Sequence, residues 1–278
     1  MNRRDEGTSK SHDGRAGAVN TQALAVGLCT LALATIASPL HAQCRAASGS
    51  GEVAVFELYT SEGCDSCPPA DRWFSALKSN AEAARGVALA FHIDYWDRLG
   101  WRDRFASAAY TARQHDQAAR QHAPFVYTPQ VLLQGREFSS WRSGPASAAV
   151  EAINARPAVA RIDLTASPVE RNRTTVDVRV RVPEARDRSH AAIAVALVQD
   201  GLASDVKAGE NAGKRLAHDH VVRQWHEEPA RFDAAGETSQ RVALALPEDA
   251  GPLSVVALVE NDATGAVLQA LSLPLCDR

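Results

Sequence analysis

The order of hydrophobic and polar positions changes near residue 157. Before that point, apolar strand-like runs alternate with helix-like stretches, which is typical of an α/β domain. The strand-like runs cover residues 53–59, 87–93 and 130–134, and the helix-like stretches cover 66–79, 107–120 and 145–155. After that point short apolar or alternating runs dominate, at 161–166, 174–182, 191–199, 220–225, 240–246, 253–260 and 267–273. Their number and spacing predict a β-sandwich.

These patterns predict an α/β domain over residues 50–156 and an all-β, sandwich-like domain over residues 157–278. Residues 1–42 have a different character, that of a signal peptide. Basic residues precede the apolar run 23–37, and the small residue Ala42 offers a cleavage point. An uncleaved membrane anchor is the alternative, although the apolar run is short for a membrane span. We therefore expect a periplasmic or secreted protein.

Composition excludes one class of partner. The chain is 45% hydrophobic and 23% charged, with a formal net charge of −3. Such a balance provides no basic excess for binding nucleic acid. We also expect no membrane association beyond the uncleaved-anchor alternative.

The cysteine count agrees with export. Cys29 lies inside the predicted signal peptide, so the mature chain keeps Cys44, Cys64, Cys67 and Cys276. If Cys64 and Cys67 form a redox pair, Cys44 and Cys276 are left to form a structural disulfide in an oxidising compartment. The alternative is that Cys44 is a free thiol near the chain terminus.

The segment around Cys64 and Cys67 indicates thiol chemistry. An apolar strand-like run is followed by a turn, the two cysteines, and then Pro68 and Pro69. A helix that starts near residue 65 or 66 would hold both prolines in its first turn, where backbone N–H groups have no helical partner. Cys64 would then lie at the positive end of the helix dipole, which favours the reactive thiolate. The alternatives are a zinc half-site, for which no further ligands follow closely, and a structural disulfide.

Four segments together resemble a known family. They are residues 57–71 (ELYTSEGCDSCPPAD), 90–101 (AFHIDYWDRLGW), 126–130 (VYTPQ) and 209–214 (GENAGK). They are similar to a family of exported bacterial thioredoxin-like proteins that is known mainly as a domain of unknown function. The similarity runs from about residue 53 to the C-terminus. It implies a thioredoxin-like fold for residues 50–156 and brings no established substrate.

The resemblance also implies roles for individual residues. In the thioredoxin arrangement Cys64 attacks the target disulfide and Cys67 resolves the mixed disulfide. Glu57 matches the buried carboxylate beneath the cysteine pair, where desolvation would raise its pKa and suit it to be the general base. The alternative is that Glu57 points to solvent. Pro129 matches a cis-proline that faces the cysteines and excludes metal, while the Thr128 backbone would pair with an extended substrate. An ordinary trans proline that opens a strand is the alternative.

Asp94, Tyr95 and Trp96 follow an apolar run that reads as a central strand. Ligands of open α/β sheets bind at the carboxyl ends of strands, so these residues are candidates for a substrate pocket. Alternatively, the aromatic side chains cap the core beneath a loop.

Two further motifs give weaker signals. His218 and His220 would share one face of a strand, an arrangement that suits a metal ion but is weak evidence by itself. Residues 209–214 lack the spacing of a phosphate-binding loop. We interpret them as a loop with Glu210 and Lys214 paired, with a role at the interface between the two halves as the alternative.

The sequence therefore predicts a thiol–disulfide oxidoreductase. Glu62 and Asp65 near Cys64 disfavour its thiolate, which favours the reductase or isomerase direction. Its substrate would be a protein or small-molecule thiol or disulfide, and its electrons would come from a donor protein, because the chain implies no cofactor and no resident metal. The alternatives are a copper or other soft-metal carrier that uses the two cysteines with a histidine such as His92, and a binding module with a structural disulfide.

Overall fold

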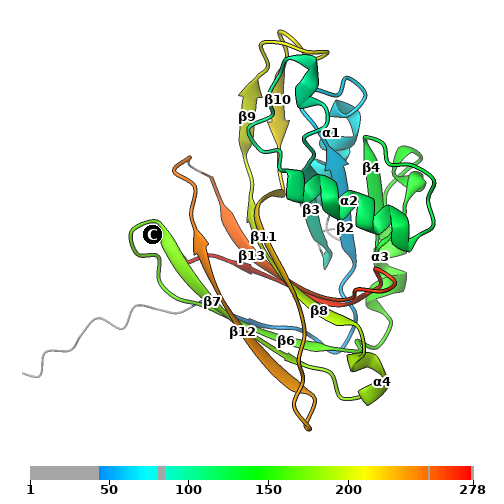
Figure 1. Cartoon of the computed structure of the whole chain (residues 1–278), viewed down its shortest axis with the longest axis vertical. Helices are drawn as coiled ribbons and strands as arrows, with labels where there is room; N and C mark the ends of the chain where they lie inside the picture. The colour runs from blue at the N-terminus through cyan, green and yellow to red at the C-terminus, as the bar shows by residue number, and fades with distance from the viewer. Residues whose placement is uncertain (1–43, 81–84, 250, 277–278) are drawn as a thin grey trace, which may run out of the picture. The chain divides into compact units, whose positions relative to one another are not determined.

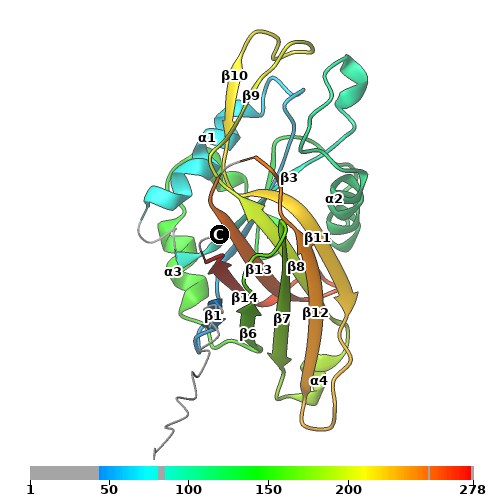
Figure 2. The same cartoon turned by 90° about the vertical axis from the view of Figure 1, so that its left-hand side faces the viewer.

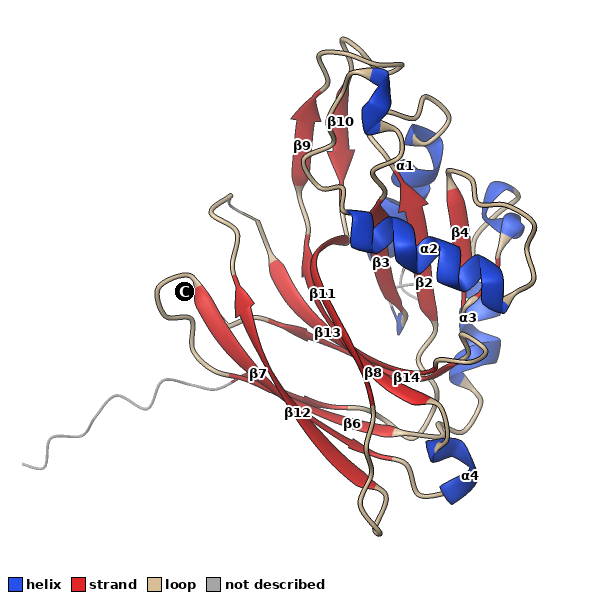
Figure 3. Ribbon diagram, viewed as in Figure 1, coloured by secondary structure: helices blue, strands red, loops and turns tan. Residues whose placement is uncertain are grey.

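The computed structural model describes residues 44–80, 85–249 and 251–276. They form a mixed α/β fold dominated by β-sheets, as the ribbon diagram shows (Figure 3). The predicted signal peptide, residues 1–42, lies outside the described residues. Within the described ranges, no helix combines the length and the apolar character that a membrane crossing requires.

Most predicted elements are present within a few residues of their expected bounds. The helices are α1 (Pro68–Ala76), α2 (Ala108–Arg120), α3 (Ser147–Asn154) and α4 (Ala185–Arg188), and the short 3-10 helices are η1 (Leu77–Ser79), η3 (Asp97–Leu99) and η4 (Ser139–Arg142). The first strands are β1 (Cys44–Ala47), β2 (Val55–Thr60), β3 (Val87–His92), β4 (Gln130–Leu133), β5 (Arg136–Glu137), β6 (Arg161–Ala166) and β7 (Arg173–Arg181). The later strands are β8 (Ala191–Gln199), β9 (Leu202–Asp205), β10 (Arg215–His218), β11 (Val221–Pro229), β12 (Glu237–Ala245), β13 (Leu253–Asn261) and β14 (Val267–Pro274). The sequence pattern did not predict the short strands β1, β5, β9 and β10, because runs of so few residues show no clear periodicity.

Strands from both sides of residue 157 belong to one sheet. The eight-stranded sheet has the order β14-β13-β8-β11-β3-β2-β4-β5, so the predicted domain boundary does not separate two sheets (Figure 1). The junction is a parallel pairing of Val221 in β11 with Ala90 in β3, and the Ala90 amide donates to the His220 carbonyl at 2.8 Å. A second sheet, β1-β6-β7-β12, and the hairpin β9–β10 complete the strand pairing.

Strand β8 shows why its sequence is continuously apolar. All nine of its residues are buried. Ile193, Val195 and Leu197 face the core shared with the four-stranded sheet, whereas Ala194, Ala196 and Val198 face the opposite core. Because side chains alternate across a strand, a strand with a core on each side must be apolar at every position. In β6 and β7 buried and more exposed residues alternate, since one face of their sheet points away from the core.

The core on the second face of β8 joins the two halves of the chain. It holds Tyr59, Leu89 and Phe91 from β2 and β3 together with residues of β8, β11, β13 and β14. Helix α2 lies on one side of β2 and β3, and α1 and α3 lie on the other, as the turned view shows (Figure 2). The cysteine segment is therefore part of a body that both halves build.

Cys44 and Cys276 form a disulfide. Cys44 begins β1, which pairs with β6 in the four-stranded sheet, and Cys276 follows β14 in the eight-stranded sheet. The bridge thus links the two sheets across a sequence separation of 232 residues. Of the two predicted states of Cys44, the structure has the paired one.

We expect Leu197→Ala to lower the free energy of unfolding by about 2–5 kcal/mol, because it leaves a cavity between two packed sheets. Leu197 exposes 0% of its surface, whereas Leu99 exposes 38%. Leu99→Ala removes the same atoms and should cost less than about 1 kcal/mol, as surface substitutions usually do. Urea unfolding of both variants measures the difference, and equal losses would contradict this account of the core.

Candidate functional site

Cys64 and Cys67 lie in the turn between β2 and α1 and form a disulfide. Helix α1 begins at Pro68, with prolines in its first two positions and Cys67 as the N-terminal capping residue. The predicted start near residue 65 or 66 was slightly early, so Cys67 rather than Cys64 stands at the helix end. The prolines fit there because the first helical N–H groups have no acceptor within the helix.

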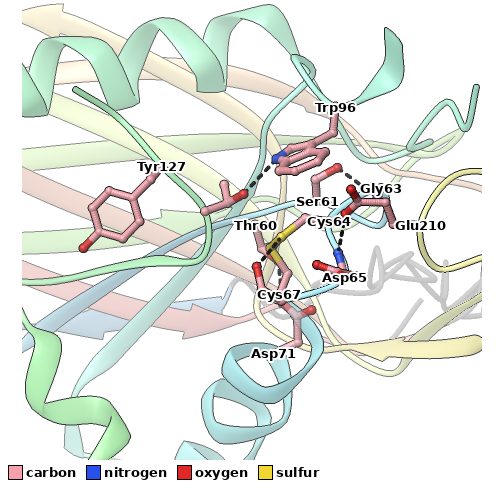
Figure 4. Close-up of a disulfide and its surroundings, with 12 residues drawn as sticks. Thr60, Ser61, Gly63, Cys64, Asp65, Cys67, Asp71, Trp96, Tyr127 and Glu210 are labelled. Carbon is pink, nitrogen blue, oxygen red and sulfur yellow. Dashed lines mark hydrogen bonds between the residues drawn. A yellow bond between two sulfur atoms is a disulfide. The ribbon is translucent and has the colours of Figure 1, made fainter. Parts of the chain in front are cut away.

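The disulfide is covered, although the residues between its cysteines are not. Cys64 and Cys67 each expose 0% of their surface, while Asp65 and Ser66 are exposed. Trp96 packs over the turn, since a Cβ atom added to Gly63 would lie 3.0 Å from the Trp96 Cβ. Its indole N–H donates to the Thr128 hydroxyl at 2.8 Å, and Figure 4 shows Trp96 beside the sulfur atoms. The sulfurs therefore lie just below the surface, under a cover of side chains.

The buried carboxyl group that follows the pair on helix α1 belongs to Asp71. Asp71 follows Cys67 by one helical turn, its amide donates to the Cys67 carbonyl at 3.1 Å, and its side chain accepts a bond from the Thr60 hydroxyl at 2.8 Å (Figure 4). Glu57 lies on the other face of β2, because its neighbours Phe56 and Leu58 pack in the core that contains α1. The predicted role of Glu57 as general base is thus wrong on geometric grounds.

Glu57 instead belongs to a buried ion network centred on Arg113 of α2. Arg113 donates to both Glu57 oxygens, at 2.9 and 3.0 Å, and to both Glu260 oxygens, at 2.9 and 3.1 Å. It also contacts Glu227 at 3.2 Å, and its guanidinium lies 4.3 Å from the centre of the Trp225 ring. Burial by itself lowers the pKa of Arg113, but Glu260 and Glu57 raise it well above its usual value. Glu57 is thus held by the guanidinium, on the face of β2 away from the cysteines.

A second buried cluster lies beside the cysteine turn. The Glu62 amide donates to Asp103 at 2.9 Å, and Asp103 contacts the His92 ring nitrogen Nδ1 at 2.7 Å. Trp101 donates to Glu62 at 2.7 Å, and His218 lies 3.3 Å from the other Glu62 oxygen. The His92 and His218 rings are 4.8 Å apart, edge to face. Each of Glu62, His92, Asp103 and His218 exposes 3% of its surface or less.

Charges within this cluster shift the pKa values of its own members and of Asp71. Burial alone lowers the pKa of His92, but the Asp103 carboxylate raises it above its usual value. Burial alone raises the pKa of Asp103, but His92 and hydrogen bonds from the Glu62 and Phe105 amides lower it below its usual value. Each partner therefore favours the charged form of the other. Burial raises the pKa of Asp71, which His218 and His92 oppose only in part. Asp71 thus keeps a proton to a higher pH than a solvated aspartate does.

The other predicted site residues lie at the cover rather than in an open pocket. The Thr111 hydroxyl donates to Asp94 at 2.6 Å, which ties the loop after β3 to helix α2. Tyr95 and Trp96 are half-buried and pack against the core of β2 and β3. The Thr128–Pro129 peptide bond is cis, and Pro129 is buried. The Thr128 hydroxyl accepts from Trp96, so the loop after β3 and the loop before β4 meet beside the cysteine turn.

Two weaker predictions are wrong. His218 ends β10, whereas His220 lies in the following turn with a left-handed φ of 57°, so the two do not share a strand face. Lys214 donates to Asn211 at 2.8 Å, and Glu210 accepts from the Asp65 amide at 3.1 Å, so Glu210 and Lys214 are not paired with each other. Over the described ranges, no three His, Cys, Asp or Glu side chains are grouped as metal ligands.

Sequence reasoning missed four residues of this region, namely Asp71, Asp103, Arg113 and Asn211. Asp71 and Asn211 lie inside motifs that the resemblance singled out, and the helical spacing from Cys67 to Asp71 was a usable signal. Asp103 and Arg113 had no such signal, because their partners come from distant segments.

Solved structures resemble this fold. Protein AGR_C_4864 from Agrobacterium tumefaciens is 25% identical, with a TM-score of 0.52, over 81% of this chain and 96% of that one. HBP35 of Porphyromonas gingivalis is 14% identical, with a TM-score of 0.59, over 81% of this chain and 76% of that one, and this likeness concerns the fold alone. No curated protein matches the chain.

A family model described as "Protein of unknown function (DUF1223)" matches residues 55–260. The match includes both cysteines of the buried pair, Asp71, Arg113 and the loop 209–214. The chain therefore belongs to this family of proteins of unknown function.

Proposed function

We propose that this protein is an exported thiol–disulfide oxidoreductase with a thioredoxin-like active segment, in which Cys64 and Cys67 are the reacting pair. The observation that carries the proposal is a disulfide at the start of a helix with a buried, proton-retaining carboxyl one turn further on. Two further observations support it. The sheet order β3-β2-β4-β5, with β2 parallel to β3 and antiparallel to β4, fits the thioredoxin-like resemblance. The second disulfide is typical of proteins from oxidising compartments.

The chemistry follows from the positions of the two sulfurs and Asp71. A substrate thiolate attacks Cys64 and forms a mixed disulfide, and Cys67 leaves as a thiolate. Protonated Asp71 donates its proton to Cys67, which prevents Cys67 from closing the ring again. A second substrate thiolate attacks the substrate sulfur of the mixed disulfide and releases Cys64 as a thiolate, which takes a proton from solvent. The substrate is thus oxidised to a disulfide and the protein pair is reduced to two thiols. In the opposite direction Asp71 accepts the Cys67 proton and Cys64 attacks.

Both directions require partners that exchange thiols and disulfides. The substrate would be a protein or a small thiol, and a donor protein would return the pair to the dithiol form. Asp65 and the buried Glu62 lie next to Cys64 and disfavour its thiolate. This charge pattern favours the reductase or isomerase direction over strong oxidation.

A structural clip is the second candidate, and the complete burial of both cysteines favours it. The two functions differ in the stability of the disulfide. We expect the Cys64–Cys67 pair to equilibrate with glutathione or dithiothreitol buffers at a potential between about −300 and −120 mV, the range of exchange catalysts. Alkylation of the free thiols followed by mass spectrometry measures this potential, and a value below about −300 mV would support the clip instead.

We expect Asp71→Asn to slow reduction of the Cys64–Cys67 disulfide by about tenfold or more, because the leaving Cys67 loses its proton donor. Since only protonated Asp71 donates, the wild-type rate per reductant thiolate should fall as pH rises through the raised pKa of Asp71. The variant should lack this fall. Rapid-quench alkylation from pH 4 to 9 gives the rates.

The matched control is Asp163→Asn, which makes the same change on the exposed face of β6. It should leave the pH profile unchanged. Overlapping profiles for wild type and Asp71→Asn would show that Asp71 does not take part.

A further inference from the structure

The motif Gly209–Lys214 is not used by the proposed chemistry, yet it contacts the cysteine turn. It forms the tip of the β9–β10 hairpin, where Gly209 and Gly213 have left-handed φ angles of 73° and 82°. Bonds from the Gly213 amide to the Val206 carbonyl and from the Val206 amide to the Lys214 carbonyl close the loop. The loop is therefore preformed by its own backbone.

Asn211 connects this loop to the cysteine turn. Its side-chain amide donates to the Cys64 carbonyl at 2.8 Å and to the Glu62 carbonyl at 2.9 Å. Its carbonyl oxygen accepts from Lys214 at 2.8 Å, and the residue exposes 0% of its surface. Both amide hydrogens are thus used on the two backbone carbonyls that flank Gly63. If Asn211 withdrew alone, the buried Glu62 carbonyl would lose this bond, and the Cys64 carbonyl would keep its 3.3 Å bond from the Cys67 amide.

The loop also contacts Asp65, between the two cysteines, and the segment that holds Trp101. Glu210 accepts from the Asp65 amide, which lies between the two cysteines. A Cβ atom added to Gly209 would lie 3.4 Å from the Trp101 Cβ, so the loop packs against the segment that holds Glu62. Asn211 thus bonds to the turn at Glu62 and Cys64, and Glu210 bonds to it at Asp65, between the two cysteines.

We propose that Asn211 is a positioning residue that latches the 209–214 loop over the Cys64–Cys67 disulfide, so that exchange requires this loop to withdraw. The inference rests on the proposed function, because it concerns access to the same sulfurs. With the latch closed, an incoming thiolate has no path to Cys64. With the loop withdrawn, the thiolate attacks Cys64 and electrons pass from two reductant thiols to the protein disulfide, as described above.

Reduction kinetics of the full mature chain test the latch. With dithiothreitol as reductant, the wild-type rate should level off at high concentration, because loop opening then limits it. Asn211→Asp keeps the side-chain shape but has no donor for the two carbonyls near neutral pH. We expect it to raise the rate at least tenfold and to abolish the plateau. Asn211→Ser keeps one hydrogen-bond donor and should give a rate between those of wild type and Asn211→Asp. This second variant tests the latch even if Asn211→Asp does not fold.

Two controls separate the latch from general destabilisation. Lys214→Met leaves both Asn211 donors in place and should change the rate less than twofold. Val178→Ala weakens the distant core of the four-stranded sheet, where Val178 exposes 0% of its surface, and should also leave the rate nearly unchanged. Equal acceleration by Val178→Ala and Asn211→Asp would overturn the latch, as would an unchanged rate in Asn211→Asp.

The outcomes for the latch and for the proposed function remain distinct. Dithiothreitol reports access to the sulfurs whether or not the pair serves as a catalyst. If the reduction potential lies below about −300 mV and Asn211→Asp is reduced faster than wild type, the exchange function is contradicted and the latch is supported. If the potential lies between about −300 and −120 mV and Asn211→Asp is reduced at the wild-type rate, the exchange function is supported and the latch is contradicted.

Discussion

The position of one buried guanidinium constrains the whole molecule. Arg113 binds carboxylates from β2 in the first half of the chain and from β11 and β13 in the second half. Arg113, Glu57 and Glu260 are buried, so an arrangement that lost the cation would leave buried carboxylates uncompensated. The network therefore ties helix α2 to strands from both halves of the chain. In the same fold, Asn211 and Glu210 of the β9–β10 hairpin bond to the cysteine turn of the first half.

Because of this arrangement, the environment of the disulfide is built by both halves of the chain. The cysteines, Glu62, Asp71, His92 and Asp103 come from the first half, while His218, Glu210 and Asn211 come from the second. The second half thus shapes the charge and the cover around the sulfurs. A description of residues 50–156 as a free-standing unit would leave the Cys64 and Glu62 carbonyls without the donor that Asn211 supplies.

Sequence patterns predicted the elements well where burial is one-sided or complete. Strands β6 and β8 have the expected bounds, because strict alternation and a continuous apolar run are unambiguous signals. Helix α2 shows the opposite case. Its buried residues Tyr110, Arg113, Gln114, Gln117 and Ala118 have helical spacing, but three of them are polar. Hydrophobic periodicity therefore gives no hint of its ion network, and partners such as Glu260 cannot be inferred from local sequence.

Burial of a disulfide and its reactivity are compatible when the covering layer is thin and locally bonded. Here Asp65 and Ser66 are exposed directly beside the two buried cysteines, and in the latch that we propose a movement of the 209–214 loop would expose Cys64. The bonds that oppose such a movement are few, two from Asn211 and one from Glu210, and each contributes about 0.5–1.5 kcal/mol net. Opening on this scale costs far less than unfolding the shared core, which would require separating both sheets. In the latch that we propose, a cover of this strength would keep the sulfurs covered at rest and would still let a competing partner reach them.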